Sequence, residues 1–215
     1  MIRIVTILVA SHIAALAFAQ DSEPEFYRKL ESLFYEVISA RLTEKPLPCT
    51  WPNPAVLEKQ ALLTSELSEA MPSTGPLVLL YAVTANSLAD VRRLDEAGAY
   101  REDPWGTPLH AAASFGDSAM LEYLVSVGLG LEDRGEASGP ALLVAAVENR
   151  MDNVKWLVEN GADVNAIDTQ GVPVIRFALA CRNQQLVDYL LDAGAVPDQL
   201  TRERAPGLGI SLGDE

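Results

Sequence analysis

The chain has 215 residues, of which 49% are apolar and 21% are charged, and its formal net charge is −14 at pH 7. This length and apolar content are enough for the core of one ordinary domain or one short solenoid. The acidic excess argues against nucleic acid or an anionic membrane surface as the main partner, because both repel a negatively charged protein. It favours a basic protein partner, although solubility alone would also account for it.

The first nineteen residues have the pattern of a secretory signal peptide. Arg3 supplies a short positive region, residues 4–16 are mostly apolar, and the letters AFA at 17–19 form a cleavage pattern. The apolar run is shorter than the roughly 20 residues that a membrane-spanning helix needs, so we expect no stable membrane insertion after cleavage. Loss of Arg3 makes the mature chain one unit more negative. The short, Ala-rich signal is typical of bacteria, so the periplasm is the expected compartment and secretion the alternative.

Residues 20–73 are expected to form a helical N-terminal cap region. Apolar residues at helical spacing predict a helix over about 25–42, and a second helix is expected over about 54–71. Four prolines between positions 46 and 54 exclude a helix between them. Exposed Phe26, Leu33 and Phe34 would be a liability on a free arm, so packing on the first repeat is favoured over an arm that grips a partner.

A sequence repeat occupies residues 74–198. Its closing glycines are spaced by 30, 33 and 33 residues, and three further columns share this period. The columns are Gly98, Gly128, Gly161 and Gly194; Leu94, Leu124, Leu157 and Leu190; Val91, Leu121, Val154 and Val187; and Ala82, Ala112, Ala145 and Ala178. Each unit reads as a short helix of small residues, a turn, an amphipathic helix and a glycine suited to a helix end. Because no unit can bury its apolar face alone, the stack is the folding unit.

The repeat resembles the ankyrin repeat. The run TPLHAA at 107–112 and the run NGADVNA at 160–166 match motifs of that family, and DAGA at 192–195 matches in part. The resemblance implies an all-α solenoid of about four helix-turn-helix units behind the N-terminal cap, in a protein of the exported bacterial type. Only the second unit keeps the whole motif, and the position of His110 holds Leu80, Leu143 or Arg176 in the other units. Residues 199–215, rich in glycine towards the end, are expected to be a flexible tail.

Catalytic chemistry is sparse in this sequence. His110 is the only histidine of the mature chain, and the resemblance gives it a structural role. One histidine and two distant cysteines do not make a metal cluster, and no glycine-rich loop suggests a cofactor. We therefore expect no enzyme; the alternative is a site with a perturbed carboxylate in a closed pocket between residues 20–73 and the repeats. Cys49 and Cys181 can form a disulfide in an exported chain, with two buried thiols as the alternative.

The resemblance implies that the protein binds another protein through a concave face of loop tips and first helices. The candidate partner-binding residues are Tyr100, Arg101, Glu102, Asp103, Trp105, Phe115, Asp133, Arg134, Glu136, Glu148, Asp168 and Gln170. Trp156, between two core positions of its helix, indicates packing or an outer surface instead. Within the exported bacterial type, an immunity protein that neutralises a toxin is expected, with a secreted effector that binds a host protein or an envelope stress-defence accessory protein as alternatives.

Overall fold

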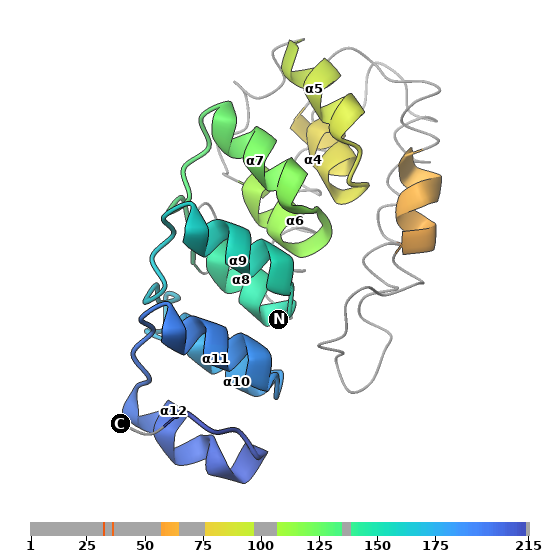
Figure 1. The fold of residues 1–215 in the computed structure, drawn as a ribbon. Helices are drawn as coiled ribbons and strands as arrows, with labels where there is room; N and C mark the ends of the chain where they lie inside the picture. Colours follow the sequence, from red (N-terminus) through yellow and green to blue (C-terminus); the bar gives the residue numbers. More distant parts are fainter. Residues whose placement is uncertain are drawn as a thin grey trace.

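The computed structural model describes residues 32, 36, 57–64, 76–96, 107–134 and 139–213. Residues 57–64 are helical, and the labelled helices follow them in pairs (Figure 1). These are α4 (Pro76–Thr84), α5 (Leu88–Glu96), α6 (Thr107–Phe115), α7 (Ser118–Ser126), α8 (Ala141–Val147), α9 (Met151–Glu159), α10 (Val174–Ala180), α11 (Gln184–Asp192), α12 (Gln199–Arg204) and the short 3-10 helix η2 (Pro206–Leu208).

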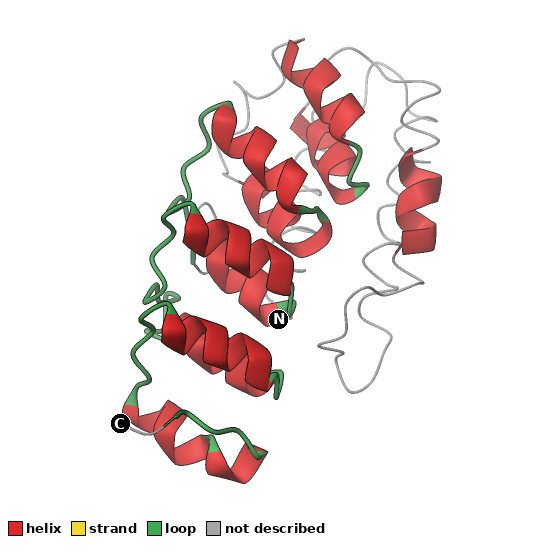
Figure 2. Ribbon diagram, viewed as in Figure 1, coloured by secondary structure: helices red, strands yellow, loops and turns green. Residues whose placement is uncertain are grey.

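The helix pairs stack into a solenoid, as the sequence predicts. The inner helices α4, α6, α8 and α10 contact one another in succession, and each packs on its partner α5, α7, α9 or α11. Figure 2 shows the described residues as helices joined by loops, and the only bridge between extended residues in this part joins Ile167 and Pro173. The all-α fold of four helix-turn-helix units is therefore confirmed.

The repeated columns of the sequence form the core of the stack. The four alanines at 82, 112, 145 and 178 are fully buried, and the two apolar columns of the outer helices are at most 1% exposed. Small side chains on the inner helices let neighbouring units approach closely, while the leucine and valine columns fill the space between helix layers. Residues that recur at the repeat period are thus the ones that every unit buries.

The closing glycines end the outer helices in a left-handed conformation. Gly128, Gly161 and Gly194 have φ of 109°, 96° and 95°. In each case the N–H of the residue after the glycine donates to the carbonyl of the repeated leucine four positions before the glycine. One example is the bond from Ala195 to Leu190 at 2.8 Å. This geometry satisfies carbonyls that the helix end leaves open, and a residue with a Cβ would be strained there. Gly98 lies outside the described residues.

The C-terminal segment differs from the prediction of a flexible tail. Residues 199–204 form α12, which contacts α10 as the inner helix of a fifth, incomplete unit would. Ala205 and Ile210 are 1% and 7% exposed, so this segment covers the open end of the fourth unit. The expectation was wrong over 199–213 because an exposed apolar unit face needs a cover. Residues 214–215 lie outside the described part.

The described part of the N-terminal region packs on the repeats. Helical residues 57–64 fall inside the helix predicted over 54–71; Leu63 is fully buried and Gln60 is 5% exposed. Lys59 also pairs with Glu36 at 3.0 Å. The proposed signal peptide and the rest of 20–73 lie outside the described residues. In the residues that are described, no helix is both long enough and apolar enough to span a bilayer.

Candidate partner-binding surfaces

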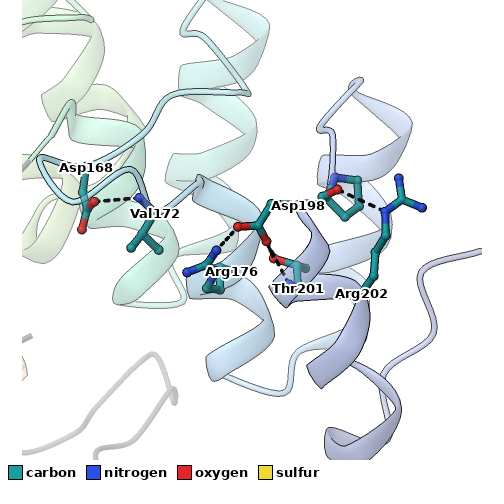
Figure 3. A network of polar contacts seen from close by, with 7 residues as sticks. Asp168, Val172, Arg176, Asp198, Thr201 and Arg202 are labelled. Carbon is teal, nitrogen blue, oxygen red and sulfur yellow. Dashed lines mark hydrogen bonds and ion pairs between the residues drawn. The ribbon is translucent and has the colours of Figure 1, made fainter.

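The loop between α9 and α10 is a compact finger organised by Asp168. Its carboxylate accepts a hydrogen bond from the Val172 N–H at 2.8 Å (Figure 3). It also accepts one from the Gln170 N–H at 2.7 Å, and the Asp168 N–H donates to the Val172 carbonyl. Gly171 has a φ of 76° at the turn. Asp168 therefore shapes the finger, while the side chain of Gln170 is exposed at its tip.

The loop after α7 contains two further candidates, both exposed. The Asp133 carboxylate accepts a hydrogen bond from the Gly130 N–H at 2.9 Å and so closes a local turn. The Arg134 guanidinium donates to the Ile167 carbonyl at 3.2 Å, which joins this loop to the next finger. Asp133 thus shapes its own loop, while Arg134 joins neighbouring fingers and keeps part of its surface open to solvent.

Two candidates expected on the concave face are buried. Phe115 and Glu148, at equivalent positions at the C-terminal ends of α6 and α8, are only 4% and 5% exposed. Gln60 contributes to the burial of Phe115, because its amide donates to the carbonyls of Thr84 at 2.7 Å and Phe115 at 3.0 Å. The helix at 57–64 thus lies across the ends of α4 and α6. The structure differs here from an open concave face, since a segment outside the repeat covers the first two units.

The remaining candidates cannot be placed. Tyr100, Arg101, Glu102, Asp103, Trp105 and Glu136 lie outside the described residues. Cys181 is disulfide-bonded, whereas Cys49, the other cysteine of the chain, also lies outside them. The pairing of these two cysteines stays a prediction.

His110 bridges two units in the interior. Its Nε2 lies 2.9 Å from the carbonyl oxygen of Gly139, and the residue is 3% exposed. The contact joins α6 to the loop that precedes α8, which agrees with the structural role that the resemblance implies. Among the described residues, no group of three His, Cys, Asp or Glu side chains is arranged to hold a metal ion.

A buried polar junction between the second and third units was not anticipated. Arg150 donates to the carbonyls of Ser114 at 2.7 Å and of Gly116, and the Asn153 amide lies 3.2 Å from the Gly116 carbonyl. Both donors are buried, at 6% and 1% exposure. The available signal was Asn153 itself, a polar residue at a position that Met120 and Leu186 fill elsewhere.

The outer helices carry a second feature that the sequence reading missed. Tyr123, Trp156 and Tyr189 are each the sixth residue of α7, α9 and α11, and all three are half-buried. The Tyr123 hydroxyl donates to Asp95 at 2.8 Å, and the Arg92 guanidinium lies 5.2 Å from the centre of its ring. Burial, then the hydrogen bond to Asp95, raises the pKa of Tyr123 to about 12.

The architecture is that of a repeat solenoid. Residues 57–64 cover the ends of α4 and α6, and the outer helices keep exposed side chains. The family comparison identifies the same repeat. A model described as ankyrin repeats (3 copies) matches residues 79–168, and one described as ankyrin repeats (many copies) matches 142–198. Together they cover more than half of the chain, which therefore belongs to the ankyrin-repeat family. Membership makes it a protein-binding module.

Similar proteins come from animals. The chain is 30% identical to human neurogenic locus notch homolog protein 1 over 161 residues, which is 71% of this chain and 6% of that protein. It is 29% identical to L-asparaginase of Dirofilaria immitis over 57% of this chain and 21% of that protein. It is 32% identical to ankyrin repeat and SOCS box protein 6 of Pongo abelii over 54% and 30% respectively.

These matches extend over small parts of the relatives. The chain spans 6% to 30% of the lengths of the three proteins, so their activities as whole proteins do not pass to it. The animal origin of these relatives gives no support to the expected exported bacterial type.

Proposed function

We propose that this chain binds a basic protein partner by reversible, non-covalent association. The observation that carries the proposal is the packed stack itself, in which the repeated columns are buried and the outer helices present polar side chains to solvent. Glu122, Asp152, Glu159, Asp188 and Asp192 are exposed there, on a chain of net charge −14. Preformed surfaces lose little ordering entropy on association, and opposite charge speeds the encounter.

The compartment and biological role are finer parts of this proposal. The pattern of residues 1–19 supports export, with the periplasm as the site of action. An acidic binder outside the cytoplasm suits the neutralisation of a basic toxin, and this immunity role is the one we propose. A secreted effector that binds a host protein would use the same stack, and an envelope stress-defence role would as well.

Two measurements test export and binding separately. N-terminal sequencing of the protein from a bacterial envelope fraction should begin at Gln20; a chain that keeps Met1 in the cytoplasm would refute export. For binding, immobilised residues 20–215 should retain a basic protein from an envelope extract at low salt and release it at high salt. The captured protein should then bind the purified chain in calorimetry. Recovery of no protein above a blank resin would refute the binding proposal.

A further inference from the structure

The aromatic column of the outer layer, formed by Tyr123, Trp156 and Tyr189, follows the repeat period. The residues lie 33 positions apart on helices that Figure 1 shows in succession along the stack, and α7 contacts α9. Tyrosine and tryptophan are the side chains that most often anchor protein interfaces. Because the column is only half-buried, part of each side chain is accessible to a partner.

Each aromatic residue of the column can be paired with the fifth residue of the outer helix one unit earlier, and we call each such pair a step. The first step shows how the outer layer holds a cation. Arg92, the fifth residue of α5, places its guanidinium over the ring of Tyr123, one unit further along, at 5.2 Å. Asp95 accepts the Tyr123 hydroxyl at 2.8 Å beside it. A guanidinium over an aromatic face gains electrostatic energy, and more where water is partly excluded.

The second step has the aromatic ring but not the cation. Glu122, the fifth residue of α7, stands where Arg92 stands in the unit before, and Trp156 takes the place of Tyr123. Glu122 is exposed and makes no hydrogen bond or ion pair within the described residues. Tryptophan is the ring that binds cations best. By repeat equivalence, a carboxylate and an indole therefore occupy the two positions at which Arg92 and Tyr123 meet in the unit before.

The third step again has a basic residue at the fifth position of the earlier outer helix. Lys155, the fifth residue of α9, precedes Tyr189, whose hydroxyl lies 3.4 Å from the Lys155 carbonyl oxygen. The fifth residue of the outer helix one unit earlier is therefore basic for Tyr123 and Tyr189, and acidic for Trp156. The middle step alone has an acidic residue where the steps on either side have a basic one.

We propose that Glu122 and Trp156 form the anchor site for an arginine or lysine side chain of the partner protein. This rests on the proposed function, because it names the surface and chemistry through which that binding occurs. The net negative charge of the chain favours such a partner. The alternative surface is closed at Phe115 and Glu148, which are buried.

A peptide probe tests the site directly. Hexa-arginine with a fluorescent label is titrated against residues 20–215 at low salt, and fluorescence anisotropy reports binding. Glu122→Arg places the chain's own cation beside Trp156, as Arg92 lies beside Tyr123, and should weaken the peptide about five- to tenfold while the melting temperature is kept. Trp156→Leu keeps an apolar side chain against the core and should weaken it by a similar factor.

The matched control is Glu58→Gln, which removes an exposed carboxylate from the N-terminal helix. Its affinity for hexa-arginine should stay within about twofold of the wild type, because only diffuse charge is lost. Equal affinities for wild type, Glu122→Arg and Trp156→Leu would overturn the proposal. So would equal weakening by Glu58→Gln and Glu122→Gln, which would show general charge attraction.

The same variants separate this inference from the proposed function. If the immobilised chain captures no protein, the binding function fails. If a captured basic protein binds wild type and Glu122→Arg with equal affinity, the proposed binding function is supported and the proposed anchor site at Glu122 and Trp156 is refuted. A loss of capture with Glu122→Arg, and none with Glu58→Gln, supports both.

Discussion

Arg176 of α10 forms an ion pair with Asp198, the residue that caps α12 (Figure 3). Asp198 also accepts the Thr201 N–H at 2.8 Å, so one carboxylate begins α12 and attaches it to the fourth unit. Arg176 stands at the position of His110, which contacts the Gly139 carbonyl two units earlier. The same position of the repeat thus attaches its unit to the next segment in both cases, through a hydrogen bond at His110 and through an ion pair at Arg176.

Loss of this pair should loosen the C-terminal cover. We expect Arg176→Met to lower the free energy of unfolding by about 1 kcal/mol, because the pair is partly exposed and solvent screens it. Hydrogen exchange of residues 199–210 should speed up while that of α8 is unchanged. Arg204→Gln, at an exposed site at the end of α12, is the control. Unaltered protection of α12 in Arg176→Met would contradict the assignment.

Gln60 should be a main attachment of the N-terminal helix. Its buried amide binds the carbonyls of Thr84 and Phe115, and Gln60→Leu leaves both without that donor. We expect a loss of about 1–3 kcal/mol in urea unfolding, since unsatisfied buried polar groups are costly. Leu62→Ala, at an exposed position on the same helix, should cost less than about 0.5 kcal/mol. Similar losses for the two variants would argue against this attachment.

Asn153 should matter more to stability than its surface-like chemistry suggests. Its amide reaches the carbonyls of Ala112, Ala113 and Gly116 at 3.2–3.3 Å. Asn153→Leu supplies the residue that the fourth unit uses but removes these bonds, so we expect a cost of about 1–3 kcal/mol in denaturant unfolding. Met120→Leu conserves volume at the equivalent site and should cost less than about 1.5 kcal/mol. A more stable Asn153→Leu protein would refute the polar junction.

Alkaline pH should destabilise the outer layer through Tyr123. Its pKa of about 12 lies above the ordinary value of 10.0, because burial and the Asp95 hydrogen bond disfavour the charged form. This contribution to stability is complete below pH 10 and is lost as the pH rises towards 12. Between pH 10 and pH 12, the free energy of unfolding should fall more steeply with rising pH for the wild type than for Tyr123→Phe. Parallel pH profiles would show that Tyr123 titrates normally.

Reduction should lower the stability of the whole stack. A disulfide between Cys49 and Cys181 would close a loop of more than a hundred residues, worth up to about 4–5 kcal/mol in the chain-entropy model. The melting temperature should drop with reductant in wild type and not in Cys181→Ser. Peptide mapping without reduction should recover the linked pair. A reactive Cys49 thiol, or a reductant-sensitive dimer, would refute the intramolecular bond.

The core and the turns were predictable because their signals are local or periodic. The alanine and leucine columns mark buried faces, and the glycines at 128, 161 and 194 mark left-handed helix ends. The candidate site was less predictable. Asp168 and Asp133 look like free surface carboxylates in the sequence, yet each binds backbone N–H groups of its own loop. Only the path of the loop shows which exposed charge is already engaged.

By itself, the sequence determined the stacking of the units, since residues recurring every 30 or 33 positions can bury their apolar faces only against copies of themselves. The tertiary structure alone decided which faces stay open. Gln60 reaches Phe115 across 55 positions of sequence, and Asp198 meets Arg176 across a helix pair. Such contacts have no period and no local composition to reveal them, because they depend on where the ends of the chain come to lie against the finished stack.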